Sequence, residues 1–190
     1  TLARLAARLL RHGVSPTRVR PVPVLRLVPL RPNPALDRAL EELTQASATP
    51  RFDRLILLSR PAVRLVIERA DELAAAPGSD LGQRVSELPV LAGGLSTANL
   101  ARDLGFHTVA TPGPPNDGGT ATDLLAYAET ELPSARGKRW LVLRSQRGSN
   151  AEWSPKPTWL DECCLLPAYT TETMPVSIDL AHRWVEEGAH

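Results

Sequence analysis

The sequence is poor in aromatic residues and in excess charge, and each shortage excludes a class of function. Phe, Trp and Tyr together make up 4% of the 190 residues, which leaves few rings to stack on the bases of a single-stranded nucleic acid. The net charge is +1, without the basic excess that nucleic-acid binders usually carry. No apolar run is long enough to span a bilayer. We therefore expect no nucleic-acid partner and no membrane span.

Cysteine and histidine are also scarce, and their positions do not predict a metal site. Cys163 and Cys164 are neighbours, so a disulfide between them would close a strained ring, and no CxxC pattern indicates zinc. They are interpreted as residues on opposite faces of one strand. This usage suits a reducing compartment, so we expect the cytoplasm or an organelle such as a mitochondrion or plastid, and not secretion. The four histidines are dispersed, without a carboxylate or Cys at ligand spacing.

What the sequence does have is a clear alternation of strand and helix patterns. Hydrophobic residues make up 43% of the chain, as in a folded globular protein. Two strand-then-helix units follow one another, FDRLILLSRPAVRLVIERADEL over 52–73 and ELPVLAGGLSTANLARDLG over 87–105. In each unit a break of small residues separates a short apolar run from a helical pattern. A helix that begins directly after a strand presents free backbone N–H groups, which suit anions.

The same alternation extends along the chain in both directions. Further strands are expected over 24–28, 106–110, 140–144 and 163–173. Further helices are expected over 2–13, 34–44, 120–132 with Thr120 as its cap, and 178–187. Residues 14–34 hold six prolines and are expected to be extended connecting chain, with 24–28 at the edge of a sheet. Strands that alternate with helices predict a parallel sheet with helices on both faces.

Two segments allow particular interpretations. TLARLAARLLRHG is rich in Arg and has no acidic residue, as in a remnant of a transit peptide, but it also places Leu2, Leu5 and Leu9 on one face of an amphipathic helix. We favour the helix of the fold. Trp153 and Trp159 stand in an irregular, proline-containing stretch, and exposed Trp in such a stretch predicts a contact surface.

The order of these signals resembles the uroporphyrinogen-III synthase family over roughly residues 3–175. The matching segments are LAARLLRHG, PVLRLVPL, FDRLILLSRPAV, AGGLSTANLARDLG, GGTATDLLAYAE, GKRWLVLRSQRG and LPAYTTE. The positions that match the family pattern most closely are Ser59, Pro61–Val63, Gly94, Thr97–Ala98, Gly105, Arg144 and Tyr169. Ser145 stands where the family has glycine. No single motif is specific, and the order and spacing carry the resemblance.

The resemblance implies an α/β fold with a flavodoxin-like parallel sheet and helices on both faces, plus a fragment of a second, similar domain. On this pattern residues 1–22 start the first domain, residues 23–172 form a complete domain, and residues 173–190 return towards the first domain. Members of the family hold the active site in a cleft between two such domains. On this interpretation the first domain is incomplete in this sequence.

The resemblance also implies a reaction. Family members close hydroxymethylbilane, an acidic linear tetrapyrrole, into uroporphyrinogen III, with inversion of the last pyrrole ring and loss of water, and they need no cofactor. If it is active, the chain is a cofactor-free hydro-lyase of haem biosynthesis. A second hypothesis is a degenerate, non-catalytic member that serves as a structural subunit of a larger assembly, mitochondrial for example, with protein partners that cover the incomplete first domain. A third is a stand-alone binder of anionic small molecules.

Six residues are the candidates for the chemistry that the resemblance implies. Tyr169 is the candidate catalytic residue, because a phenol with a pKa near ~10 is protonated at neutral pH and can donate to the departing hydroxyl. The candidate substrate-binding residues are Ser59, Arg60, Ser96, Thr97 and Arg144. No residue is assigned to a metal.

Each of the four most prominent candidates has a structural alternative. Ser59 is also expected to cap the helix that follows it, and Thr97 to cap the helix after Gly94. Arg144, at the end of a buried strand, is either a bidentate clamp on a substrate carboxylate or the partner of a neighbouring Asp or Glu. Tyr169 is alternatively a half-buried strand residue with a hydrated hydroxyl.

Overall fold

The computed structural model of the chain describes residues 11, 25–42, 52–74, 81–113, 120–148, 153–154 and 156–174. The chain divides into two compact units, one formed by Val28–Thr170 and one formed by Thr1–Leu27 with Thr171–His190. The predicted helices over 2–13 and 178–187 lie outside the described residues, apart from Arg11. The domain assignment 1–22, 23–172 and 173–190 stays a prediction.

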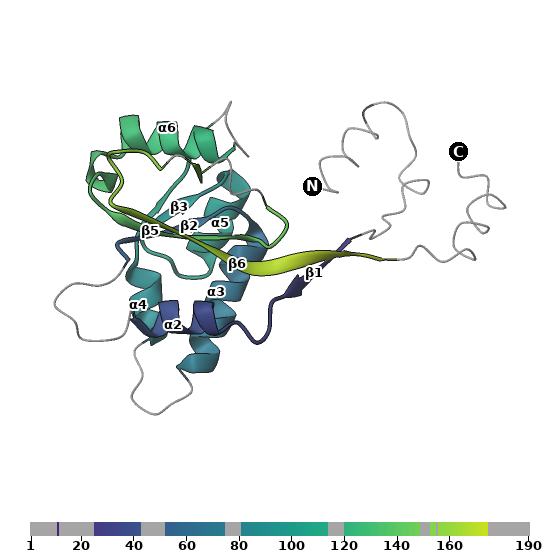
Figure 1. Cartoon of the computed structure of the whole chain (residues 1–190). Helices are drawn as coiled ribbons and strands as arrows, with labels where there is room; N and C mark the ends of the chain where they lie inside the picture. Colours follow the sequence, from purple (N-terminus) through teal and green to yellow (C-terminus); the bar gives the residue numbers. More distant parts are fainter. Residues whose placement is uncertain are drawn as a thin grey trace. The chain divides into compact units, whose positions relative to one another are not determined.

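A six-stranded sheet forms the centre of the fold, in the order β1-β6-β5-β2-β3-β4 (Figure 1). The strands are β1 Leu25–Pro29, β2 Arg54–Leu57, β3 Val90–Ala92, β4 Val109–Ala110, β5 Arg139–Ser145 and β6 Glu162–Thr173. All pairs among β2 to β6 are parallel, and Leu55 on β2 is in register with Val90 on β3 and Leu141 on β5. The predicted α/β class with a parallel sheet is confirmed, and so is the short strand at the sheet edge.

The order of the parallel strands differs from that of flavodoxin. Counted from β2, the order is 3-2-1-4-5, whereas the flavodoxin order is 2-1-3-4-5. Hydrophobic runs predict which segments are strands, but they do not predict which strands become neighbours. The direction in which strands are added reverses between β2 and β5, and open α/β sheets bind ligands beyond the carboxyl ends of the strands at such a point.

Helices cover both faces of the sheet, as predicted. They are α2 Pro34–Glu42, α3 Arg60–Leu73, α4 Leu81–Glu87, α5 Leu95–Asp103 and α6 Ala121–Glu131, followed by the short 3-10 helix η2 Pro133–Ala135. Figure 1 shows α6 on the opposite side of the sheet from α2, α3 and α4. Thr120 caps α6 in a capping box with Asp123, as expected. The sequence did not predict α4, because its seven residues bury only Leu81 and Val85.

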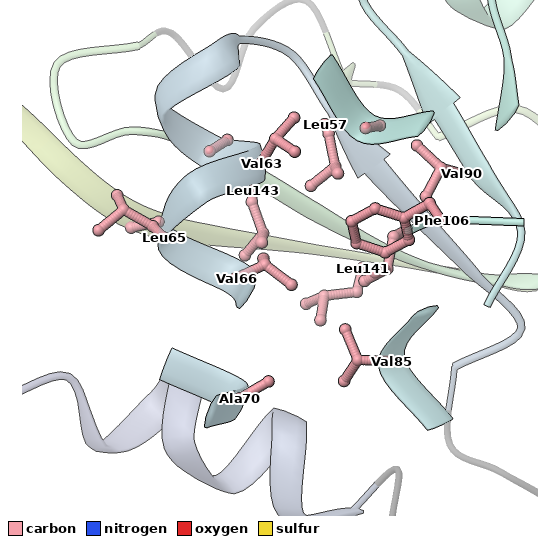
Figure 2. Packing of buried hydrophobic residues seen from close by; sticks show 14 of the residues in the cluster. Leu57, Val63, Leu65, Val66, Ala70, Val85, Val90, Phe106, Leu141 and Leu143 are labelled. Carbon is pink, nitrogen blue, oxygen red and sulfur yellow. The ribbon is translucent and has the colours of Figure 1, made fainter. Parts of the chain in front are cut away.

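The core has two parts, one on each face of the sheet. In the larger part, Val63 and Val66 of α3 pack against strand residues that include Leu57 (Figure 2). In the smaller part, Ile56 of β2 packs with Leu124 of α6. Because successive strand residues point to opposite faces, the short strands β2 and β3 are buried on both sides.

The two cysteines lie on opposite faces of β6, as predicted. Cys164 packs against the larger core part and Cys163 against the smaller one, and neither forms a disulfide. Burial, with a smaller contribution from Cys164, raises the pKa of Cys163 to about 11. Cys163 is therefore a neutral packing residue at neutral pH.

The prediction that Trp153 and Trp159 form a contact surface is wrong. Trp153 is only 6% exposed and belongs to the smaller core part. Trp159 packs against the same part, with its ring centroid 5.5 Å from that of Trp140 in an edge-on arrangement. These rings bury apolar area on the same sheet face as α6. The free energy gained by this burial holds the two Trp side chains in the core although the backbone that carries them is irregular.

Arg54 is an unusual residue in this core. It begins β2 in register with Trp140, is 6% exposed, and has a buried Nε atom without a hydrogen-bond partner. Burial lowers the pKa of Arg54, opposed by a smaller contribution from Tyr127. A buried cation without a close counter-charge costs folding free energy.

Replacing Arg54 with Met is expected to stabilise the protein by about 1–3 kcal/mol, because Met keeps the unbranched stem and removes the desolvated charge. Urea denaturation measures the change in the free energy of unfolding. As a matched variant, Arg139→Met removes a guanidinium that pairs with Asp53 at 3.4 Å, and it should not stabilise the protein. A clear loss of stability in Arg54→Met would contradict this account of the buried charge.

The first two strand-to-helix corners approach each other too closely for a side chain at Gly93. The N–H of Gly93 donates to the carbonyl of Leu57 at 3.0 Å. A Cβ atom on Gly93 would lie 2.8 Å from the carbonyl oxygen of Leu58, which is backbone and has little freedom to move. The small-residue break therefore serves the packing of β3 against β2.

Gly93→Ala is expected to lower the free energy of unfolding by roughly 1–3 kcal/mol through this overpacking. Gly82→Ala is the control, because a Cβ there would lie 3.5 Å from a flexible Asp71 oxygen and alanine favours the helix. Thermal unfolding of both variants checks the pair. Equal stability of Gly93→Ala and the parent chain would contradict the close approach.

Candidate functional site

The candidate site is the edge of the sheet at which the parallel strands end. We call it the carboxyl edge, and its residues are 58–60 after β2, 93–97 after β3, 111–113 after β4, 144–148 at the end of β5, and 167–170 of β6. Parallel strands bring their carboxyl ends to one edge, so corners far apart in the sequence become neighbours. All six candidate residues belong to this edge.

Ser59 and Tyr169 are in direct contact although 110 positions separate them. Ser59 Oγ and Tyr169 Oη lie 2.8 Å apart, and either hydroxyl can be the donor. Ser59 is also the N-cap of α3 and accepts the N–H of Ala62 at 3.4 Å, so the predicted cap is confirmed. Its side chain therefore joins the first corner of the sheet to its last parallel strand.

Tyr169 is buried except for a small part of its surface. It is 7% exposed, and its ring packs in the larger core part. The alternative interpretation of Tyr169, a half-buried residue whose hydroxyl is hydrated, is wrong, because the hydroxyl is hydrogen-bonded to Ser59. A fixed ring and a partnered hydroxyl hold the phenol in one orientation.

Arg60, Ser96 and Thr97 lie in the first turns of α3 and α5. Arg60 and Ser96 are exposed, whereas Thr97 is buried. The N-cap of α5 is Gly94 and has no side-chain cap bond, and Thr97 is the third residue of the helix, with its N–H donating to the carbonyl of Gly94 at 3.0 Å. The capping alternative for Thr97 is therefore wrong.

Among the described residues, Arg144 does not pair with an Asp or Glu, which was the structural alternative for it, and the clamp on a substrate carboxylate stays a prediction. Its Nη1 atom donates to the carbonyl of Gly148 and, at 3.3 Å, to that of Ser145. The side chain is 9% exposed, and no ion pair of Arg144 is found within the described ranges. Val142, two residues earlier, packs on the α6 face, so Arg144 projects to that face, away from the core part that holds Tyr169.

Two contacts at the carboxyl edge were not anticipated from the sequence. The backbone N–H of Gln146 donates to the carbonyl of Tyr169 at 2.7 Å. Asn33 donates from Nδ2 to the carbonyl of Pro167 at 2.9 Å. Asn33 precedes Pro34 at the start of α2, and this sequence pattern is typical of a helix cap. The contact of Asn33 with Pro167, 134 positions away, cannot be predicted from the sequence.

The carboxyl edge is positively charged. Its described residues include Arg60, Arg144 and Arg147 and no Asp or Glu. At the opposite edge, where the parallel strands begin, both signs occur, with Asp53, Glu87 and Asp161 beside Arg136, Lys138 and Arg139. The N-termini of α3 and α5 add partial positive charge to the carboxyl edge. An anionic ligand is therefore favoured at this edge.

The described part of the chain lacks two features that other functions would need. In that part, no group of three or more His, Cys, Asp or Glu side chains is placed to hold a metal ion. None of its helices combines the length and the apolar composition needed to cross a membrane.

Comparison with known proteins gives one family. A family model described as "Uroporphyrinogen-III synthase HemD" matches residues 3–151. A mutant uroporphyrinogen III synthase from the extremely thermophilic bacterium Thermus thermophilus aligns with a TM-score of 0.50 and 18% identity, over 88% of this chain and 58% of its own. The uroporphyrinogen-III synthetase of Helicobacter pylori aligns with a TM-score of 0.50 and 17% identity, over 87% and 64%. No curated protein sequence matches with significance.

Because the sequence identities to the two solved structures are low, these structures show a likeness of fold alone. This chain spans less than two thirds of the length of either one. The family model covers well over half of the 190 residues and all the candidate residues except Tyr169. The chain belongs to the uroporphyrinogen-III synthase family.

Proposed function

We propose that the carboxyl edge binds hydroxymethylbilane and that the chain takes part in its cyclisation to uroporphyrinogen III, with inversion of the last pyrrole ring, loss of water and no cofactor. The observation that carries the proposal is the 2.8 Å contact between the hydroxyls of Ser59 and Tyr169 at the edge where a parallel sheet binds ligands. Membership of the family supports the same reaction.

The hydroxyl pair suits the departure of a substrate hydroxyl. The N–H of Ala62 donates to Ser59 Oγ, and the Ser59 hydroxyl can in turn donate its own proton to Tyr169 Oη. The phenol proton then points away from Ser59, towards a ligand. Tyr169 can then donate its proton to the substrate hydroxyl, which leaves as water. Tyr169 acts as the general acid and Ser59 as its support.

The charges of the edge suit a substrate with many carboxylates. Arg60 and Arg147 are exposed and can form charge-assisted hydrogen bonds to carboxylates. Ser96 adds a hydroxyl at the start of α5, where the helix dipole favours negative charge. Arg144 has a different task, because its guanidinium is bound to the carbonyls of its own loop.

A non-catalytic structural subunit is the alternative function, and an assay of the isomers formed from hydroxymethylbilane distinguishes it from an enzyme. Hydroxymethylbilane cyclises without an enzyme to isomer I, so an excess of isomer III reports catalysis. The proposed function requires that excess for this chain. Its absence would favour the structural subunit.

Tyr169→Phe is expected to lower kcat for isomer III by about 10²–10⁴-fold, since it removes the acid and keeps the ring. Chromatographic separation of isomers III and I measures the rate. Tyr127→Phe is a matched control, because Tyr127 is the other tyrosine of the chain and lies on α6, and its rate should equal that of the parent. An unchanged rate in Tyr169→Phe would contradict the proposed role.

Arg60→Gln combined with Arg147→Gln is expected to raise KM about tenfold and to leave kcat nearly unchanged, because each exposed charge contributes roughly 0.2–1 kcal/mol of uniform binding. The KM of the parent should also rise with salt, which screens such contacts. Arg136→Gln removes another exposed charge before β5, at the opposite edge, and should not change KM. Equal KM values for the double variant and the parent would count against this edge as the binding surface.

A further inference from the structure

The alternation of β6 side chains between the two faces of the sheet is interrupted partway along the strand. Cys163 and Leu165 pack on the α6 face, whereas Cys164 and Leu166 pack on the α3 face. Strict alternation would place Tyr169 with Cys163 and Leu165 on the α6 face. Tyr169 instead packs in the larger core part, on the α3 face.

The pairing of β6 with β5 explains this change. Arg144 is in register with Pro167, and the next residue, Ser145, is in register with Tyr169, so Ala168 is an extra residue on β6. Such a β-bulge reverses the facing of the residues that follow and is one way of re-aiming a side chain. Pro167 suits this place, because proline cannot donate to a sheet ladder.

The reversal decides what the Tyr169 hydroxyl can reach. Ser59 begins α3, the helix that covers the same face of the sheet as the Tyr169 ring. Without the extra residue, the ring would project to the face that α6 covers, where Ser59 is not available. The 2.8 Å contact between the two hydroxyls therefore depends on the bulge.

The three bulge carbonyls are bound by donors from outside β6. Leu30 donates its N–H to the Ala168 carbonyl at 3.0 Å, and Gln146 donates to that of Tyr169 at 2.7 Å. Asn33 donates from Nδ2 to that of Pro167 at 2.9 Å. The loop that carries Gln146 is in turn held by the bonds from Arg144 to Ser145 and Gly148.

We propose that Asn33 and Arg144 are positioning residues that hold the β6 bulge and so place the Tyr169 hydroxyl on Ser59. The catalytic consequence rests on the proposed function of Tyr169, but the structural part does not. Asn33 is suited to the task, because its Oδ1 accepts the N–H of Leu36 at 3.2 Å and thus fixes the side chain at the start of α2. Every residue involved lies in the unit Val28–Thr170.

The test uses Asn33→Asp in the full chain. Aspartate keeps the oxygen that caps α2 and replaces the Nδ2 donor with an oxygen that repels the Pro167 carbonyl. With 13C label at the tyrosine Cζ atoms, the chain gives two signals, because it has two tyrosines, and Tyr127→Phe assigns them. The Tyr169 signal of Ser59→Ala marks the hydroxyl without its partner. In Asn33→Asp the Tyr169 signal should move towards that value, and the Tyr127 signal should not.

Asn99→Asp is the matched control, because it makes the same chemical change at an exposed position of α5, and it should leave the Tyr169 signal in place. Arg144→Met should move the signal in the same direction as Asn33→Asp, because methionine keeps an unbranched stem and cannot donate to the carbonyls of Ser145 and Gly148. A folded Asn33→Asp chain with an unmoved Tyr169 signal would overturn the proposal. If that variant does not fold, Asn33→Ser, which keeps only a cap oxygen, is judged by the same signal.

The spectra are recorded without substrate, so they test the bulge whether or not the chain turns over. Kinetics of the same variants test the link to the proposed function. Asn33→Asp should lower kcat about fivefold, as expected for one lost hydrogen bond, and leave KM unchanged. A moved Tyr169 signal with an unchanged kcat would keep the positioning role and refute Tyr169 as the acid. A lowered kcat with an unmoved signal would refute the positioning role alone.

Discussion

The parallel register of β2 with β3 on one side and β5 on the other is the constraint on which the rest of the structure depends. It aligns the ends of the three strands and therefore brings their corners to one edge. It also requires the close approach of Gly93 to Leu58, so the glycine is a consequence of the register and needs no ligand to explain it. The anionic preference of the edge follows from the same geometry, because α3 and α5 begin there.

The hydroxyl pair of Ser59 and Tyr169 adds a second requirement to this frame. A β6 strand without the bulge would keep the hydrogen bonds of the sheet, but it would direct the Tyr169 phenol to the face that α6 covers. The extra residue at Ala168 interrupts the ladder, and donors from the loop after β5 and from the segment between β1 and α2 bind the carbonyls of the bulge. Arg144 gains a structural explanation in this way. Its guanidinium binds backbone carbonyls of the loop after β5, a contact that was not expected from its place at the end of a strand.

The sequence predicted what depends on local pattern and missed what depends on neighbours. Apolar runs and small-residue breaks located β2, β3 and β5, and Thr120 with Asp123 located the start of α6. The strand order, the burial of Trp153 and the task of Arg144 depend on segments far away in the chain, and no periodicity encodes them. Ser59 and Tyr169 were each singled out by resemblance, but their contact across 110 positions required the fold.

The central claim is that ligands bind at the carboxyl edge, beside Ser59 and Tyr169. The most direct measurement is an amide NMR titration of the labelled chain with uroporphyrinogen III, the stable product of the proposed reaction under reducing conditions. The account predicts that the shifted signals belong to residues 59–62, 94–97 and 145–148. Shifts confined to the opposite edge, around Asp53, Glu87 and Asp161, or to the outer surface of α6, would contradict it.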